Sequence, residues 1–546
     1  MTRPCSRPFF TLFTLLAILL SLLGSAVFAT PAHAAGITVN TTEDEINTDG
    51  DCSLREAIQA ANTDSAVDGC LAGSGADTIT LPAGTYTLTI PSTGSGEETT
   101  NLDGDLDITS DLTIQGAGAE STIIQAGTLG YPDAGANGIS GLFQISTLLG
   151  TPYTVNINDV TIANGKNVQY NAGAGILMFA STLNLNNTVF SGNDATGAAG
   201  ALLAWGGSVT INNSIFKENH SGGGGGAIQQ NTGILNITNS SFLENLASSI
   251  NGGGAISANG TVTITNSTFA NNTALNHSGG GIYYGGTPGS TLTLRNNTFA
   301  GNSAPFGGAL KVEGTAYLYN NILADSVRAP GAYINVDCHN YGTIYGNNNL
   351  IETDDYSSPC GGNLTNSITR QDPQLDALTG AAPYVFPLKV TSPAVEAGDD
   401  AVCNAAPVST LDQRGVARPQ GNHCDLGSYE LVLSPGFSLV ETNGSTDVIE
   451  GGVSDTYTMI LNNPPTDDVT ITPSPDAQVT VSPSSLTFTH DNWHTPQTVT
   501  VTGVLDAAAE GTHTGTVRHT ISTTAPAYGS LSAPDLPANV YEVDLS

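Results

Sequence analysis

The sequence predicts an all-β chain in which a right-handed parallel β-helix is followed by a C-terminal β-sandwich. The β-helix is predicted first by a repeat. Phe-x-x-Asn units recur at spacings of 26, 26, 27 and 30 residues, at Phe190, Phe216, Phe242, Phe269 and Phe299. A fixed period of this length is typical of a solenoid. The second observation is that segments such as TVTITNSTF alternate apolar with polar residues and are rich in Thr, Val and Ile, which favours strands over helices.

The first 34 residues have the features of an export signal. Arg3 and Arg7 precede an apolar run over residues 9–23, and Ala32-His33-Ala34 is a small-x-small cleavage site. The run is short for a membrane span, and no later stretch of about 18 apolar residues replaces it. We therefore expect residues 1–34 to be a signal peptide. The mature chain is expected to be a secreted or extracellular monomer without a transmembrane segment.

Six of the seven cysteines remain when Cys5 is removed with the signal: Cys52, Cys70, Cys338, Cys360, Cys403 and Cys424. An even number of cysteines in an exported chain suggests disulfides. They fall into three local couples, so we expect the pairing 52–70, 338–360 and 403–424. Metal binding by these cysteines is less favoured, because no C-x-x-C pair is present.

The mature chain is strongly acidic. Without Arg3 and Arg7 it has 11 basic and 48 acidic residues, a net charge of −37. This charge argues against nucleic acid as a partner, because phosphates need a basic surface. Only six acids lie between residues 151 and 330: Asp159, Asp194, Glu218, Glu244, Glu313 and Asp325. A nearly neutral set of coils suits glycans or a surface protein better than a charged polymer.

Residues 35–150 are expected to form an N-terminal cap and the entry coils. Ser53 and Glu56 make a capping box for a short helix. One face of that helix is apolar and would cover the first coil; it comprises Leu54, Ala57, Ile58 and Ala61. Arg55 and Glu56 are adjacent, and adjacent helical residues do not converge on a substrate, so a catalytic role for them is less favoured.

The acidic run over residues 103–107 has two interpretations. It is similar to a Ca²⁺ loop, but no Glu follows at the twelfth position. Asp105 and Asp107 alternate with Leu106 and Ile108. We therefore favour an entry strand with its polar side chains outward.

Residues 151–330 are expected to form the regular coils. Each coil would stack on the next at about 4.8 Å, which places the five phenylalanines in one interior aromatic stack. An asparagine precedes each phenylalanine by three residues. These asparagines are expected to bend the chain between strands and to bond coil to coil through their amides: Asn187, Asn213, Asn239, Asn266 and Asn296.

The alternation of GGAI with FxxN over residues 155–325 resembles the polymorphic outer-membrane-protein repeats of bacterial surface adhesins. Those repeats are β-helical, and the resemblance implies exposure on a cell surface and attachment. The segment CSLREAI, residues 52–58, resembles the CSLREA N-terminal domain of secreted bacterial β-helix proteins.

The segment 331–432 is expected to hold the terminal coils and a cap that closes the C-terminal end. DQRG at 412–415, Arg418-Pro419 and CDLGSYE at 424–430 resemble the choice-of-anchor Q domain. That family pairs a β-helix with a C-terminal surface anchor, so the resemblance implies attachment to the cell surface.

Residues 437–546 alternate in short strands with Pro and Asp at the turns, which predicts a β-sandwich. Glu450-Gly451-Gly452 and the loop from Asp506 to Glu510 resemble the Calx-β family. The resemblance implies that Ca²⁺ is the candidate cofactor, with Glu450, Asp506 and Glu510 as ligands. The alternative is that these are ordinary loop acids.

A parallel β-helix is also the fold of pectate lyases and polygalacturonases, the pectin-lyase-like solenoids. Such enzymes need two or three facing carboxylates, and a lyase also needs an Arg or Lys as base. Arg295 shares its column with no carboxylate, and Glu218 and Glu244 stack without a third acid. His220 and His277 lie in Gly-rich turns and are expected to be solvated, without a paired acid or serine.

Exposed aromatic residues beside the glycine corners are the candidate ligand-binding residues, because such rings stack on sugars. They are Trp205, Tyr283 and Tyr284; the alternative is that they pad a turn. The sequence therefore favours adhesion or the binding of a glycan or protein, without chemistry. The alternative function is that of a polysaccharide lyase or a glycoside hydrolase.

Overall fold

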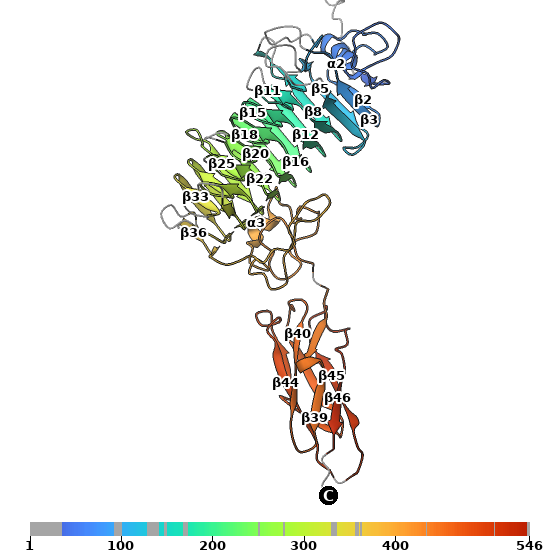
Figure 1. Cartoon of the computed structure of the whole chain (residues 1–546), viewed down its shortest axis with the longest axis vertical. Helices are drawn as coiled ribbons and strands as arrows, with labels where there is room; N and C mark the ends of the chain where they lie inside the picture. The colour runs from blue at the N-terminus through green and yellow to red at the C-terminus, as the bar shows by residue number, and fades with distance from the viewer. Residues whose placement is uncertain are drawn as a thin grey trace, which may run out of the picture.

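The computed structural model describes residues 35–91, 101–127, 141–146, 150–167, 173–248, 252–276, 279–328, 336–354, 360, 363–432, 434–506 and 508–542. The predicted signal peptide and His277 lie outside these residues. Figure 1 shows a stack of β-coils with a helix at its N-terminal end, a loop-rich cap beside the last coils, and a sandwich of strands at the C-terminus. The predicted fold class, a parallel β-helix followed by a β-sandwich, is confirmed.

Three parallel sheets form the β-helix. The first sheet has 19 strands: β1 (Gly36–Thr38), β2 (Asp77–Leu81), β4 (Leu106–Ile108), β5 (Leu112–Gly116), β7 (Phe143–Ile145), β8 (Thr154–Asn158), β11 (Ile176–Phe179), β12 (Thr182–Asn186), β15 (Leu202–Asn212), β18 (Ile228–Thr238), β21 (Ile256–Ala258), β22 (Thr261–Thr265), β25 (Ile282–Tyr284), β26 (Thr291–Arg295), β29 (Leu310–Val312), β30 (Thr315–Tyr319), β33 (Cys338–Asn340), β34 (Thr343–Asn347) and β36 (Leu364–Thr365).

The other two sheets have shorter strands. The second sheet has 11: β3 (Gly84–Leu88), β6 (Thr122–Ala126), β9 (Thr161–Ala163), β13 (Val189–Ser191), β16 (Ile215–Lys217), β19 (Ser241–Leu243), β23 (Thr268–Ala270), β27 (Thr298–Ala300), β31 (Ile322–Ala324), β35 (Leu350–Ile351) and β37 (Ile368–Thr369). The third has 7: β10 (Lys166–Asn167), β14 (Asp194–Ala195), β17 (His220–Ser221), β20 (Leu246–Ala247), β24 (Thr273–Ala274), β28 (Ser303–Ala304) and β32 (Val327–Arg328).

Equivalent residues of successive coils lie one above the other. The strand pairing joins Phe190 to Phe216, Phe216 to Phe242, and so on to Phe299. Their rings are stacked with centroids 4.7, 4.9, 4.7 and 4.5 Å apart, and all five are buried. Because these phenylalanines recur once in each coil, their rings form a continuous aromatic column inside the β-helix.

The predicted asparagine column bends the chain but does not form the coil-to-coil ladder. Asn187, Asn213, Asn239, Asn266 and Asn296 all have φ between 47° and 52°, a left-handed conformation that asparagine tolerates better than most residues. Side chains in such a turn point away from the core, and those of Asn187 and Asn213 are exposed. Asn187 Nδ2 donates to Asp159 of the preceding coil, and Asn296 Oδ1 accepts from Asn320 Nδ2 at 3.5 Å. Asn266 instead donates to the Leu411 carbonyl of the cap, so the predicted bonding along the stack is present at the two ends of the column and not as a continuous ladder.

The ladder is formed instead by the asparagine that ends each FxxN unit. Asn193, Asn219, Asn245, Asn272 and Asn302 are fully buried. Each side-chain Nδ2 in this series donates to the Oδ1 of the next asparagine at 2.9 Å. From Asn219 onward the same nitrogen also donates to the carbonyl of a phenylalanine in the preceding coil. The FxxN unit thus supplies both the apolar and the polar interior column.

The N-terminal cap contains the helix α2 (Leu54–Thr63), and the capping box predicted at Ser53 and Glu56 is present. Its apolar face packs into the same core as the first coils. Arg55 is buried; its Nε lies 2.7 Å from Asp44 Oδ1, and its guanidinium donates to the carbonyls of Gly104 and Asp105. These contacts give Arg55 a structural role in joining the helix to β4.

The acidic residues of β4 are covered, not exposed. Asp107 has no exposed surface, and its carbonyl accepts a 2.6 Å hydrogen bond from Asn62 of α2. Asp105 is also buried. The expectation of an outward polar face was wrong, because helix α2 packs against this short strand.

The C-terminal cap lies along the flank of the β-helix and not over its open end, so the prediction of an end plug was wrong. Gln413 Nε2 donates to Ser241 Oγ at 2.9 Å, and its Oε1 accepts from Thr268 Oγ1 at 2.7 Å. Ser428 hydrogen-bonds to Thr298 in the next coil. Outward residues of the second sheet beneath the cap, such as Ile322, are apolar and buried, which explains why the cap docks there.

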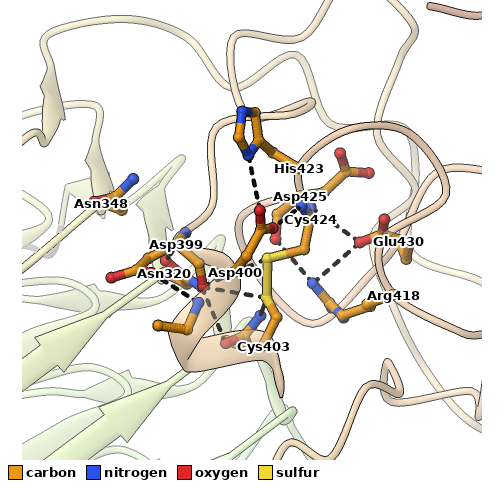
Figure 2. The surroundings of a disulfide bond; sticks show 12 residues. Asn320, Asn348, Asp399, Asp400, Cys403, Arg418, His423, Cys424, Asp425 and Glu430 are labelled. Carbon is orange, nitrogen blue, oxygen red and sulfur yellow. Dashed lines mark hydrogen bonds and ion pairs between the residues drawn. A yellow bond between two sulfur atoms is a disulfide. The ribbon is translucent and has the colours of Figure 1, made fainter. Parts of the chain in front are cut away.

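The interior of this cap is an ionic network beside a disulfide, as Figure 2 shows. Arg418 is buried; it donates to the carbonyls of Asp425 and Gly427 at 2.8 and 2.7 Å and lies 3.4 Å from Glu430 Oε2. Burial, with the charge of Glu430, raises the pKa of Asp425. The short helix α3 (Asp400–Asn404) carries Cys403, which is bonded to Cys424. The DQRG and CDLGSYE segments therefore stabilise the cap.

The three disulfides have the nearest-neighbour pairing: Cys52–Cys70, Cys338–Cys360 and Cys403–Cys424. The first lies beside α2, the second ties the last coils, and the third holds the flank cap. Within the described ranges, no helix has both the length and the apolar character needed to cross a membrane.

The C-terminal sandwich has its own core, formed between two sheets and separate from that of the β-helix. One sheet has the order β38 (Phe437–Glu441), β40 (Asp455–Leu461), β44 (Gln497–Gly503), β42 (Val479–Ser482). The other has the order β39 (Thr446–Ile449), β46 (Leu536–Tyr541), β45 (His513–Ser522), β41 (Val469–Pro475), β43 (Leu486–Phe488).

Candidate functional site

One part of the outward side of the first sheet, formed by its five-residue strand segments, is rich in amides and hydroxyls, and we call this part the amide–hydroxyl face. Alternate residues of each five-residue strand point inward as Val, Leu, Ile or Ala, so the other three point outward. The face consists of Thr154, Asn156, Asn158, Thr182, Asn184, Asn186, Ser208, Thr210, Asn212, Ile234, Asn236, Thr238, Thr261, Thr263, Thr265, Thr291, Thr293, Arg295, Thr315, Tyr317, Tyr319, Thr343, Tyr345 and Asn347. No member of this set is acidic, and Arg295 is its one cation.

Side-chain amides hydrogen-bond along the face. Asn184 donates to Asn156 at 2.9 Å, and Asn212 donates to Asn186 at 3.0 Å. Each amide has two donors and an acceptor with two lone pairs, so these bonds leave further groups directed to solvent. The ladder holds the amides in fixed positions at the strand spacing of about 4.8 Å.

Tyrosines occupy the C-terminal end of the same face. Tyr317 stacks on Tyr345, with ring centroids 5.6 Å apart, and 48% of Tyr345 is exposed. The guanidinium of Arg295 lies 5.6 Å from the centre of the Tyr319 ring. The sequence analysis missed Tyr317 and Tyr345 as candidates. Aligning YGNNN at 345–349 with YLYNN at 317–321 and TLRNN at 293–297 would have placed both rings in one outward column.

The three predicted aromatic residues have different environments. Trp205, on β15, is 51% exposed. Tyr284 has no exposed surface; its hydroxyl is 2.9 Å from Ser290 Oγ and donates to the Gly260 carbonyl. The prediction that Tyr284 binds ligand was therefore wrong. It alternates with Tyr283 along β25, and the inward member of a strand pair packs in the core.

Tyr283 points outward but is engaged by its neighbours. Its hydroxyl donates to Glu313 Oε2 at 3.0 Å, and Lys311 Nζ lies 5.2 Å from its ring centre. Burial, with the nearby Glu313 carboxylate, raises the pKa of Tyr283 to about 12. This tyrosine offers less free ring surface than Trp205 or Tyr345.

A groove runs over the second sheet where the flank cap leaves it open. It has a volume of about 660 Å³ and lies between strands β6, β9, β13 and β16 and the loop Gly380–Tyr384. An adjoining hollow of about 310 Å³ is lined by turn asparagines and by Gln413 and Arg414 of the cap. Glu120 is the one acid among the residues that line the groove, and Lys217 is also among them.

The described residues of coils 151–328 do not bring three carboxylates close enough to share an ion. Farther along, burial and the charges of Asp325 and Asp372 raise the pKa of Glu352. Among the described residues, three groups of His, Cys, Asp or Glu lie close enough to share an ion, and none is on coils 151–328. Two of these groups are in the N-terminal loop between Glu45 and Asp68, and one is in the sandwich. Glu218 and Glu244 occupy successive exposed turns with φ of 55° each. The described part of coils 151–328 therefore lacks the carboxylate set of a polysaccharide-cleaving enzyme.

His220 has both an acid and a serine as partners, so the prediction that it lacks them was wrong. Its Nδ1 is 2.7 Å from Asp194 Oδ1, and its Nε2 is 2.9 Å from Ser248 Oγ. The partners come from the coils on either side. They are 26 and 28 residues away, so a search near His220 in sequence did not find them. Comparing positions one coil apart would have found both.

The sandwich brings together two of the three predicted calcium ligands. Glu450 and Glu510 lie with His513, whose Nε2 is 4.0 Å and 3.5 Å from their carboxylates. Asp506 was wrongly included; its Oδ1 accepts from the backbone of Ala508, and it lies outside this cluster. His513 Nδ1 is 2.8 Å from the Gly511 carbonyl, which directs Nε2 toward the two acids.

Comparisons with known proteins agree with the geometry of the coils. Residues 148–326 match the family model described as the right-handed beta helix region. Searches of curated proteins and of solved structures found no significant match. The fold thus defines the class, a protein built on a parallel β-helix, and the chain is similar to the right-handed members of that class over its regular coils.

Proposed function

We propose that this chain is an exported β-helix protein that binds an uncharged glycan through the amide–hydroxyl face. The observation that carries the proposal is the composition of that face, which offers fixed amides and hydroxyls, no acid, and tyrosines at one end. Sugar hydroxyls both donate and accept hydrogen bonds, and sugar rings pack against aromatic faces. A surface protein recognised by the same face is the second candidate partner.

The proposed location is outside the cell, in secreted form or attached to its surface. It is supported by the predicted signal peptide and by the three disulfides, since disulfides persist in oxidising compartments. The resemblances to surface-adhesin repeats, to the CSLREA domain and to the choice-of-anchor Q domain support attachment. Adhesion is the role that a rigid, exposed binding face would serve.

A glycan array probed with the mature chain tests the proposal. We expect binding to neutral glycans, and a loss of at least about tenfold in affinity for Tyr345→Ala, since one stacking contact is worth about 1.4 kcal/mol or more. Tyr541→Ala, an exposed tyrosine of the sandwich, is the matched control. Equal binding by Tyr345→Ala and the wild type would contradict the proposal. A loss confined to Tyr384→Ala would move the site to the groove.

The competing function is cleavage of a polysaccharide. Assays on uronic-acid polymers with and without Ca²⁺ test it directly. Turnover of any of these polymers, abolished in Glu218→Gln or Glu244→Gln, would replace the binding proposal with a lyase or hydrolase.

For the sandwich we propose a cation held by Glu450, Glu510 and His513. Carboxylate oxygens suit Ca²⁺, as the Calx-β resemblance implies, whereas the imidazole suits Zn²⁺. Glu450 is only 3% exposed, and a cation would neutralise its buried charge. We expect Ca²⁺ or Zn²⁺ to raise the melting temperature of the wild type but not of Glu450→Gln. Asp506→Asn, the control, should respond as the wild type does; no shift with either ion would contradict the site.

A further inference from the structure

The third sheet of the β-helix joins a serine, a histidine and an aspartate in one hydrogen-bonded chain. His220 Nδ1 lies 2.7 Å from Asp194 Oδ1, and His220 Nε2 lies 2.9 Å from Ser248 Oγ. Both distances are those of good hydrogen bonds. The order of groups, acid to Nδ1 and hydroxyl to Nε2, is the one by which a histidine activates a serine.

The hydrogen bond to Asp194 determines which ring nitrogen of His220 carries a proton when the ring is neutral. The hydrogen bond from His220 holds the pKa of Asp194 below its ordinary value, and the charge of the neighbouring Lys166 contributes. An ionised carboxylate can only accept a hydrogen bond, so Nδ1 carries the ring proton. When the ring is neutral, Nε2 holds a lone pair, and Ser248 donates its hydroxyl proton to it across the 2.9 Å contact. Nε2 is thus placed to remove that proton.

The backbone of each member is fixed by the β-helix. β14 and β17 pair Asp194 directly with His220. The Ser248 amide donates to the Ser221 carbonyl at 2.8 Å, and the Ser248 carbonyl accepts from Asn276 Nδ2 at 2.5 Å. The three groups therefore come from three stacked coils whose relative positions are set by strand pairing. A catalytic arrangement needs this kind of preorganisation.

This Ser–His–Asp series is accessible to solvent, because the side chain of His220 is 38% exposed. The site lies on the outside of a sheet, so it suits an ester whose acyl group is itself exposed. Small esters and ester substituents on a polymer are of this kind.

We propose that Ser248, His220 and Asp194 form a hydrolytic triad that cleaves accessible acyl esters. Ser248 Oγ attacks the acyl carbon while its proton passes to His220 Nε2. The bond from the acyl carbon to the alcohol oxygen then breaks, and the alcohol leaves with that proton. Water, deprotonated by His220, attacks the acyl carbon; its bond to Ser248 Oγ breaks, Oγ regains the proton from His220, and the acyl group leaves as a carboxylic acid. This activity is independent of the proposed glycan binding, since it uses a different sheet.

Two measurements on the mature protein test the proposal: hydrolysis of p-nitrophenyl acetate, and covalent labelling by a fluorophosphonate with the labelled residue located by peptide mass spectrometry. We expect one label, on Ser248. Ser248→Ala is expected to lose the label and to lower the hydrolysis rate by at least about 100-fold. His220→Gln and Asp194→Asn should reduce both readouts. Ser303→Ala, a matched change on β28 of the same sheet, should leave both unchanged.

Several outcomes would overturn the triad: no labelling of the wild type, a label on another serine, or hydrolysis that survives Ser248→Ala. Circular dichroism establishes that the variants are folded. The residue that is labelled in the wild-type protein tests the triad even if a variant does not fold. Glycan binding by Ser248→Ala is expected to equal that of the wild type, so the two proposals can fail separately.

Discussion

At the scale of single residues, each coil depends on side chains that accept a positive φ. A second turn column, one residue before the ladder asparagine, contains Asn164, Gly192, Glu218, Glu244, Asn271, Gly301 and Asp325, with φ between 51° and 70°. Glycine and asparagine suit this conformation, whereas glutamate is strained there. The choice of residue in this column therefore affects stability without changing any interior contact.

Two substitutions in this column should have opposite effects. Gly192→Ala is expected to lower the free energy of unfolding by about 1 kcal/mol, because φ is +65° and the only atom close to the added Cβ is the Asn164 side-chain oxygen at 3.1 Å. Glu218→Gly is expected to leave stability equal or to raise it by up to about 1 kcal/mol. Denaturant unfolding measures both. Equal effects of the same sign would contradict the strain argument.

A buried carboxyl makes stability depend on pH. Burial raises the pKa of Asp337 to about 7, although the amides of Ser326 and Thr353 donate to it at 3.1 and 2.6 Å. The folded protein therefore keeps a proton that the unfolded chain has lost above about pH 4. The stabilisation from this group is complete below about pH 4 and is lost as pH rises through about 7.

The measurement is the free energy of unfolding at pH 5 and pH 8. We expect the wild type to be less stable at pH 8, with a contribution from Asp337 of a few kcal/mol at most, about 1.4 kcal/mol for each unit of pKa shift. Asp337→Asn should show a smaller difference between the two pH values. Glu43→Gln, an exposed change, is the control. A difference that is the same in Asp337→Asn and the wild type would contradict this assignment.

At the scale of the structural element, two interior columns of side chains stabilise the coil, and they have different roles. The phenylalanine column excludes water, and the asparagine column satisfies the carbonyls that the turns leave unpaired. A buried carbonyl without a partner costs about 1–3 kcal/mol. The amide ladder therefore fixes the register of each coil on the next, which the non-directional packing of rings does not.

Replacing one ladder amide tests this division of roles. In Asn245→Asp the Nδ2 donor is lost, so the carbonyl of Phe216 and Asn272 Oδ1 would each face a carboxyl oxygen in place of a donor at 2.9 Å. We expect a loss of about 3 kcal/mol or more in unfolding free energy. Asn213→Asp, at an exposed turn that tolerates aspartate, should change it by less than about 0.5 kcal/mol. Similar losses in both would contradict the ladder argument.

At the scale of the whole molecule, the β-helix and the sandwich have separate cores. The contacts between them include His490 with Asn422 at 2.7 Å and with Glu396 at 3.8 Å, both at exposed or half-buried positions. Exposed polar pairs contribute little to stability. The two parts should therefore unfold as separate cooperative units.

The two tryptophans allow this to be measured. Trp493 is buried in the sandwich core, and Trp205 lies on the β-helix. In Trp205→Phe, fluorescence reports only the sandwich, whereas far-ultraviolet circular dichroism reports both parts. We expect the dichroism to show two transitions, one of which coincides with the fluorescence transition. A single coincident transition that survives His490→Ala would show that the two parts are coupled.

The sequence by itself determined the coil. Its contacts recur at one period, so aligning the chain with itself identified the Phe190–Phe299 column. The alternation of apolar and polar residues identified the strands, and the local spacing of the cysteines identified the disulfides. Side-chain direction within the turns was not determined in this way, because Asn187 and Asn193 are both asparagines six residues apart, and only the backbone angles show which one points inward.

Only the tertiary structure decided which surfaces are free and which distant groups meet. Gln413 and Ser241 are 172 residues apart, and their contact holds the cap against part of the second sheet. Ser248, His220 and Asp194 meet because three coils stack. The physical reason is that local periodicity specifies what lies inside each coil, whereas the docking of a cap or the meeting of side chains on separate coils depends on contacts that no local pattern records.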